Sequence, residues 1–232
     1  MSKNVRARRY CRAMTPLEVV VRGHARRKYA AERATVAMSA TLDDAERTDV
    51  YRRAVALQDR LLTDLRGLHD SGAVHRWSSD QLRVFSHRPY SKNGRAPLRF
   101  RVDIRAEAEF VDFEQLSTFL DRWAIEDGVE IGHIAWDVTE ENRQTYEAVL
   151  CQEAVRNAAV KARAFAEAAG RGEVTAVQLA DPGMLQAQAE YGAPRAMVMA
   201  APAGMAGGGP TLDLTPDDIT LEAAVDAKFI AE

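Results

Sequence analysis

The stretch from Leu98 to Phe110 alternates strictly between apolar and charged residues. Each even-numbered residue is apolar and each odd-numbered residue is charged in this run, which reads Leu-Arg-Phe-Arg-Val-Asp-Ile-Arg-Ala-Glu-Ala-Glu-Phe. Side chains alternate between two faces along an extended chain, so a period of two predicts a strand with one buried and one solvent-exposed face. At about 3.3 Å per residue the strand spans roughly 40 Å. The rest of the chain must supply elements that cover its apolar face.

Apolar residues spaced three and four apart predict helices that can provide this cover. The predicted helices run over 45–68, from Asp112 to Gly128, and over 145–169. Asp43, Asp44 and Asp112 are predicted caps, because a short side-chain oxygen can accept hydrogen bonds from the first turn of a helix. Alanine dominates the third helix, and small side chains let a helix lie close to a sheet.

Further strands are predicted at 17–22, 34–42, 79–86, 129–138, 174–179 and 219–229. Gly23 is expected to close the first of them. An Asn93-Gly94 pair between Pro89 and Pro97 predicts a turn that pairs 79–86 antiparallel with the long strand. The strand at 219–229 alternates again, and we expect it to lie beside the long strand.

Composition divides the chain further. We expect a disordered basic tail at 1–15, a first αβ half at 16–110 and a second at 111–180. A mobile loop rich in Ala, Met, Gly and Pro follows at 181–210, and 211–232 forms a closing strand that returns to the sheet.

The charges are unevenly distributed, although the net charge of the 232-residue chain is only −3. Residues 1–28 are strongly basic, and the segment after residue 211 is acidic. This asymmetry predicts either an acidic partner for the basic end or contact between the two ends, including contact across subunits. No apolar run is long enough for a transmembrane helix, and no apolar signal region follows the charged start. We therefore expect a cytoplasmic protein.

Several segments share motifs, in the same order, with one known family. A Val-rich strand leads to a glycine in Val19-Val20-Val21-Arg22-Gly23, and Ala31-Glu32-Arg33-Ala34-Thr35-Val36 follows. Later come Gly128, the Ile131-Gly132-His133-Ile134 strand and the alanine helix Ala154-Val155-Arg156-Asn157-Ala158-Ala159-Val160-Lys161-Ala162. The final strand is entered through Thr215-Pro216-Asp217-Asp218-Ile219. In these features the chain resembles the SIMPL domain family over about 17–180 and 211–230.

The resemblance implies an α+β fold of two βαβ-like halves, with long antiparallel strands and helices packed on the sheets. The family includes periplasmic proteins linked to oxidative-stress defence and a mammalian protein that associates with a signalling kinase. Some members form ring-like or channel-like homo-oligomers. The resemblance supplies no catalytic residues.

The residues themselves predict no enzyme. The five histidines, His24, His69, His75, His87 and His133, lack the spacing of metal ligands. Neither a nucleophile elbow nor a phosphate-binding glycine loop is present. Cys11 and Cys151 do not make a disulfide framework. We therefore expect no catalytic residues, cofactor or metal.

The charged side of the long strand and the preceding hairpin form the candidate interaction surface. Its residues are Arg83, Arg88, Arg99, Arg101, Arg105, Glu107 and Glu109. One interpretation is a surface for subunit contacts, because the strand has a positive end and a negative end. The alternative is a binding module for nucleic acid or a small ligand, formed by the basic hairpin 83–105 with Phe85, Tyr90 and Phe100 and by the basic tail. Acids share the charged face and Phe100 falls on the apolar face, so subunit contact is favoured.

The sequence therefore predicts a non-enzymatic SIMPL-type protein that forms homo-oligomers. It is expected to act as a scaffold or interaction module, with a protein partner and a role in stress response as further expectations. Nucleic acid stays open as the less favoured partner.

Overall fold

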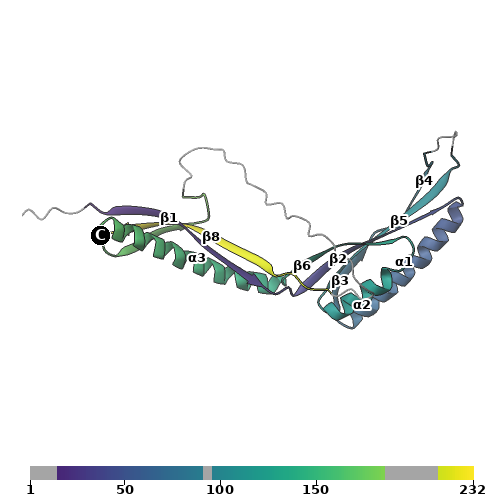
Figure 1. Cartoon of the computed structure of the whole chain (residues 1–232), viewed down its shortest axis with the longest axis horizontal. Coiled ribbons are helices and arrows are strands. Elements are labelled where there is room, and N and C mark those ends of the chain that lie inside the picture. Colours follow the sequence, from purple (N-terminus) through teal and green to yellow (C-terminus); the bar gives the residue numbers. More distant parts are fainter. Residues whose placement is uncertain (1–14, 91–95, 186–213) are drawn as a thin grey trace, which may run out of the picture. The chain divides into compact units, whose positions relative to one another are not determined.

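The computed structural model describes residues 15–90, 96–185 and 214–232 (Figure 1). These residues form two compact units, each built from segments that are distant in the sequence. The three-stranded unit contains residues 15–28, 141–185 and 220–232, and the five-stranded unit contains 29–90, 96–140 and 214–219. The predicted α+β class is confirmed, because helices pack on two antiparallel sheets. The predicted tail (apart from its last residue), the tip of the hairpin and most of the predicted 181–210 loop lie outside the described residues.

The five-stranded unit has the β-α-β-β-α-β order of ferredoxin-like domains. Its elements are β2 (Arg33–Asp44), α1 (Arg47–Asp70), β3 (Val74–Ser79), β5 (Arg99–Phe110), α2 (Phe113–Trp123) and β6 (Val129–Asp137). The strand order is β3-β5-β2-β6, and a short strand, β4 (Arg83–His87), also pairs with β5. The long alternating strand is therefore central to the sheet.

The alternation along β5 places its apolar residues in the core, as predicted. Each even-numbered residue from Val102 to Phe110 is buried, and β5 pairs antiparallel with β2 from Ala34 opposite Phe110 to Asp44 opposite Phe100. Leucines of α1 and the apolar stripe of α2 cover this face. One face of the sheet is thus closed by helices, while the charged face of β5 stays open.

The predicted hairpin is confirmed, with changed strand limits. β4 pairs antiparallel with β5, from Arg83 opposite Asp103 to His87 opposite Arg99. The strand predicted over 79–86 corresponds to β4, which begins only at Arg83, and the sequence did not predict the preceding strand β3, which also pairs with β5. The predicted Asp112 cap is also confirmed, because its carboxylate accepts from the backbone N–H groups of Glu114 and Gln115. Asp44 accepts from the N–H groups of Ala45 and Glu46, just before α1 begins.

The prediction that the closing strand neighbours the long strand is wrong. That closing strand, β8 (Ile219–Ala231), lies between β1 (Leu17–Tyr29) and β7 (Val174–Ala180) in the other sheet. β5 already pairs with β2 on one side and with β3 and β4 on the other, so it has no free edge for a further strand.

In the three-stranded unit the alanine helix lies directly on the sheet. α3 (Glu140–Ala168) begins earlier than predicted and buries its alanines at a spacing of four residues, Ala154, Ala158, Ala162 and Ala166. Ala158 and Ala162 share a core with residues of β1 and β8, including Val19, Val21 and Phe229. The small side chains bring the helix backbone close to the strands.

Gly23 does not end the first strand, because β1 continues to Tyr29. A Cβ atom at Gly23 would lie 2.0 Å from the carbonyl oxygen of Ala154 and 2.9 Å from the Cβ of Ala158. The glycine is therefore required by the close approach of α3 and not by a turn. The charged run Arg26-Arg27-Lys28, predicted to lie between strands, belongs to β1.

Candidate interaction surfaces

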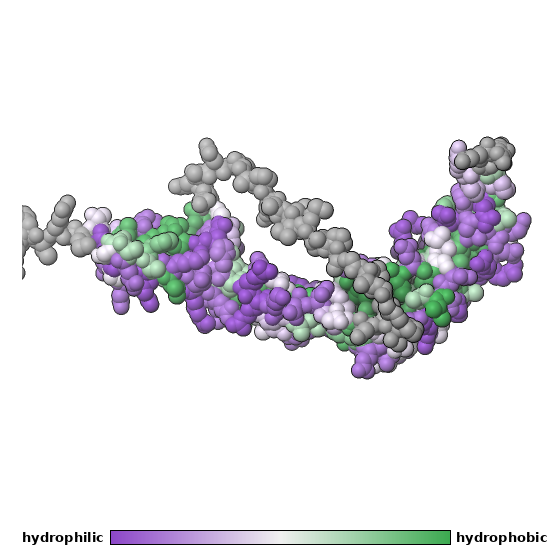
Figure 2. Space-filling model, viewed as in Figure 1, coloured by the Kyte–Doolittle hydropathy of each residue, from purple (hydrophilic) through white to green (hydrophobic). Residues whose placement is uncertain are grey.

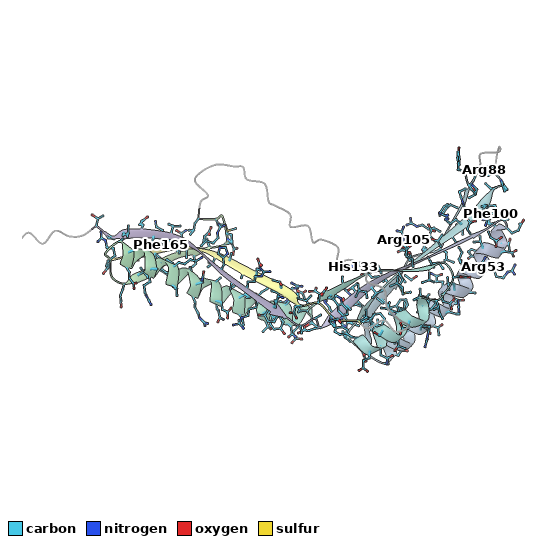
Figure 3. The ribbon with its side chains drawn as sticks, in the orientation of Figure 1. Arg53, Arg88, Phe100, Arg105, His133 and Phe165 are labelled. Atoms are coloured by element: carbon cyan, nitrogen blue, oxygen red, sulfur yellow. The ribbon has the colours of Figure 1, made fainter. Side chains whose placement is uncertain are left out.

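The open face of the five-stranded sheet carries most of the predicted interaction surface. Strand alternation and the β4–β5 register bring Arg83 and the odd-numbered residues of β5 to the face opposite α1 and α2. Arg105 stands on this face in Figure 3. Arg88 lies just beyond β4, where its guanidinium donates to the carbonyl of Ala96 at 2.8 Å. Three zones follow one another along the face.

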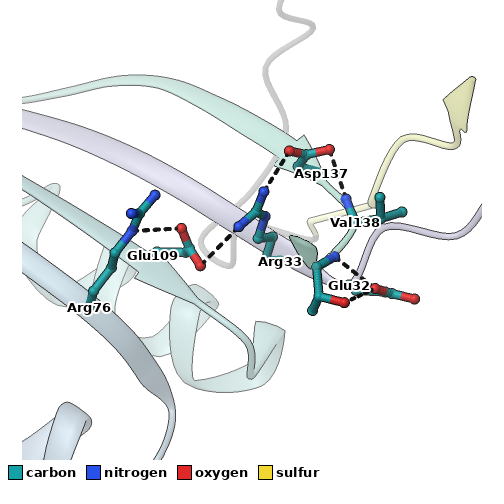
Figure 4. Close-up of polar contacts among 7 residues, drawn as sticks. Glu32, Arg33, Arg76, Glu109, Asp137 and Val138 are labelled. Carbon is teal, nitrogen blue, oxygen red and sulfur yellow. Dashed lines mark hydrogen bonds and ion pairs between the residues drawn. The ribbon is translucent and has the colours of Figure 1, made fainter. Parts of the chain in front are cut away.

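The first zone is a charge network at the Glu109 end of β5 (Figure 4). Glu109 is only 4% exposed and lies between Arg33 and Arg76, with contacts of 3.5 and 3.0 Å. Arg33 also contacts Asp137 at 2.9 Å, and the other oxygen of Asp137 accepts from the backbone N–H of Val138. Glu109 therefore differs from the predicted surface residue, since it is buried and paired within its own unit.

The second zone is a groove of about 390 Å³ at the centre of the sheet. Small residues of β2 and β6, among them Ala37, Ser39 and Gly132, make its floor, and Arg105 and Glu107 stand over it. Neither Arg105 nor Glu107 forms an ion pair with a described residue. Among the predicted surface residues of β5, these two therefore have no counter-ion in the described part of the chain. The small residues of the floor have no reactive or charged groups, so the sequence did not indicate a groove there.

The third zone surrounds Asp43 at the other end of β5. The Asp43 carboxylate contacts the guanidinium of Arg99, and it lies 3.3 Å from Nε2 of His87 and 3.9 Å from Nε of Arg101. Asp43 is therefore a counter-ion for these basic side chains and not the helix cap that the sequence predicted. The positive end of β5 is partly neutralised by β2, as its negative end is by Arg33 and Arg76.

A smaller cleft of about 210 Å³ adjoins the second zone and shares Asp80 and Arg105 with its groove. It is lined by Asp80, Gln81, Arg83, Phe85, Asp103 and Arg105. Phe85 is 43% exposed, and its β5 partner in the ladder is Arg101. An exposed aromatic ring therefore lies beside arginines on the open face, whereas Phe100 falls on the apolar side as predicted.

The three-stranded sheet has two edges that differ in protection. On β1, the N–H of His24 donates to Oδ1 of Asn157 at 3.1 Å, and the carbonyl of Arg22 accepts from Nζ of Lys161 at 2.8 Å. Both side chains belong to α3, so the helix binds the backbone of β1 at Arg22 and His24. Within the part of the chain that the structure describes, no side chain bonds to the backbone of β7.

The sequence of β7 also lacks the usual protection of an edge strand. It reads Val-Thr-Ala-Val-Gln-Leu-Ala, without a charge or a proline. Figure 2 shows apolar residues on the visible surface of this unit, and the exposed ones in β7 and the turn after it are Val177, Leu179 and Met184. The residue pattern at 174–179 predicts this strand, but its place at an edge depends on the order of the strands in the sheet.

A metal site, a reactive cysteine and a membrane-spanning helix each make structural requirements of the described residues. Among residues 15–90, 96–185 and 214–232, no three His, Cys, Asp or Glu side chains gather as they would around a metal ion. Cys151 is exposed on α3. In the same ranges, no helix combines the length and the apolar character needed to cross a membrane.

Comparison with known proteins supports the resemblance seen in the motifs. A search among curated proteins finds no significant match. The sequence model of one family, SIMPL, matches residues 19–229, which include both units and all the strands and helices described above apart from the outermost residues. The chain therefore belongs to the SIMPL family, which is described as protein of unknown function (DUF541).

Proposed function

We propose that this SIMPL-family chain is a non-enzymatic protein that assembles with copies of itself and acts as a scaffold or interaction module. The supporting observation is the β7 edge, an uncharged strand of seven residues whose backbone no described side chain covers. Unpaired N–H and C=O groups on such an edge are a template for another strand, and natural proteins normally blunt them with charges, proline or covering elements.

The exposed side chains of β7 add a second driving force. Val177 and Leu179 are 53% and 50% exposed, and both are apolar. Removing apolar surface from water is favourable at about 25 cal/mol per Å². Contact between copies at this edge both pairs the backbone and covers these side chains.

Sedimentation velocity of the full chain over micromolar concentrations tests self-assembly. We expect a dimer or larger species whose share grows with concentration. A single monomeric species over the whole range would contradict the proposal.

A second candidate is a nucleic-acid or small-ligand binding module on the basic hairpin, and the position of Phe85 favours it. The ring is exposed beside Arg83 and Arg105, so a base could stack on it while the arginines bind phosphate. Binding of single-stranded oligonucleotides at low salt tests this function. Phe85→Ala should abolish binding, while Tyr51→Ala, at a similarly exposed aromatic of α1, should not. Absence of binding at low salt would rule the candidate out.

A role in stress defence and a cytoplasmic location are parts of the proposal that rest on the family resemblance and the sequence. Survival of cells with and without the gene under peroxide tests the first. Cell fractionation tests the second.

A further inference from the structure

We infer that β7 pairs antiparallel with β7 of a second copy, so that two three-stranded sheets become one sheet of six strands. This inference specifies the contact of the proposed self-assembly and rests on it. Asn157 and Lys161 bind the backbone in the middle of β1, at His24 and Arg22. Among the described residues no side chain binds the backbone of β7, so β7 is the less protected edge of this sheet. An edge that pairs with its own copy gives an isologous contact, which closes as a two-fold dimer and does not propagate into a filament.

The charges at the ends of β7 favour the antiparallel direction. Arg171 precedes the strand and Asp181 follows it, and neither forms an ion pair with a described residue. Antiparallel pairing brings each Arg171 to the Asp181 of the other copy, twice per dimer. Parallel pairing would place like charges together, which is destabilising.

The same charges favour one register. A two-fold axis at Ala176 sets Arg171 opposite Asp181 and leaves Glu173 opposite the neutral Leu179. An axis at Val177 would set Glu173 opposite Asp181, and two carboxylates would face each other. Of these two registers, the charge pattern favours the one with Ala176 at the axis.

One feature of β7 opposes pairing. The β7–β8 ladder shifts register between Ala176 and Gln178, and bulges of this kind can discourage strand addition. The bulge leaves Val177 outward and more than half exposed, however, so it does not remove the apolar surface. Pairing covers Val177 and Leu179 in both copies.

Disulfide cross-linking tests the axis directly. In a full chain with Cys11→Ser and Cys151→Ser, Ala176→Cys places one thiol at the axis in each copy. Facing residues of paired strands are within the distance that a disulfide spans. We expect a covalent dimer on mild oxidation. Val20→Cys, on the occupied β1 strand, is the matched control and should stay monomeric on a non-reducing gel.

Charge substitutions test the contact without a cross-link. Val177→Lys should weaken dimerisation by roughly tenfold or more, whereas Val20→Lys, at a similarly exposed valine, should leave the dimer constant unchanged. Arg171→Asp and Asp181→Arg should each weaken the dimer, and the double variant should restore it. Circular dichroism checks that each variant is folded.

The outcomes separate this inference from the proposed function. A wild-type chain that is only monomeric overturns both. The wild-type chain could instead assemble while Ala176→Cys gives no cross-link and Val177→Lys has no effect. This result would overturn the β7 contact and show that assembly uses another surface.

Discussion

The guanidinium of Arg22 on β1 holds the carboxylate of Asp226 on β8 with two hydrogen bonds. Nε donates to Oδ1 at 2.6 Å and Nη2 donates to Oδ2 at 2.9 Å. The Asp226 side chain is only 8% exposed, and it also accepts from the backbone N–H of Gly183 at 2.7 Å. One carboxylate therefore joins two strands to the turn that follows β7. This turn ends the strand that we infer to be the dimer contact.

Asp226→Asn should destabilise the three-stranded unit by about 1–3 kcal/mol, because hydrogen bonds to a charged group are lost and Arg22 keeps no equal partner. Unfolding in urea measures the change. Glu222→Gln is the control, since Glu222 pairs with Arg26 between the same strands but both side chains are more than 60% exposed. We expect less than about 0.5 kcal/mol there. Equal effects of the two substitutions would contradict the structural importance of Asp226.

The same carboxylate predicts a pH dependence. The hydrogen bond from Arg22 lowers the pKa of Asp226; burial opposes this effect, and the N–H of Gly183 reinforces it. A folded-state pKa below the unfolded value of about 3.9 stabilises the fold above that value, and the contribution is lost as pH falls through the folded pKa. The stability difference between wild type and Asp226→Asn should therefore be constant near neutral pH and shrink in acid. A difference independent of pH down to complete protonation would contradict the ion pair.

Gly23→Ala should destabilise the chain by roughly 1–3 kcal/mol, because its Cβ would meet the carbonyl oxygen of Ala154 and push α3 away from β1. The melting temperature measures this effect. Gly67→Ala is the control. It lies within α1 with nothing within 4 Å of the new Cβ, and alanine there should stabilise the helix by about 0.5–1 kcal/mol. The two changes should have opposite signs.

The sequence predicted the helices and strands themselves better than it predicted which of them lie side by side. Alternation in β5 and the alanine spacing in α3 depend on local periodicity, so both could be recognised without the structure. The partners of β8 and the counter-ions of Glu109 depend on which strands lie side by side. Arg33, Arg76 and Glu109 come from three strands, and nothing in their spacing indicates that they meet.

Strand pairing also decides which charged residues of β5 have a counter-ion and which do not. All the odd-numbered residues of β5 look equally exposed in the sequence. Register with β2 neutralises Arg99 through Asp43, and register with β2 and β3 buries Glu109. On β2, the residues opposite Arg105 and Glu107 are the uncharged Ser39 and Ala37. The charges at the two ends of β5 are therefore largely neutralised by side chains of the same unit. For this reason we propose self-assembly through β7 and not through β5.

Glu109→Gln should destabilise the five-stranded unit by about 3 kcal/mol, since it removes one charge of a buried pair and leaves Arg33, which is only 17% exposed, with Asp137 alone. Glu107→Gln is the matched control on the same face of the same strand, where the side chain is exposed, and should change stability by less than about 0.5 kcal/mol. Chemical unfolding measures both. A neutral Glu109→Gln would show that the network of Figure 4 contributes little.

Gly128 is required both by backbone conformation and by contact. Its φ is +76°, and an added Cβ would lie 2.5 Å from the carbonyl oxygen of Thr41. That approach also brings the Gly128 carbonyl to the N–H of Thr41, which donates to it at 2.9 Å between β2 and the start of β6. Gly128→Ala therefore adds a clash to the conformational cost of about 1–2 kcal/mol that a left-handed alanine carries.

Gly170→Ala separates these two effects. Gly170 has a φ of +69° but open space around the new Cβ, so its substitution carries the conformational cost alone. Thermal unfolding of both variants should show a larger loss of stability for Gly128→Ala. Hydrogen exchange should also be faster at the amide of Thr41 in that variant, because the methyl group pushes β2 and the start of β6 apart. Equal losses in the two variants would mean that the backbone at Thr41 yields to the methyl group. In that case the glycine at position 128 would be required by its backbone conformation and not by the close approach of β6 to β2.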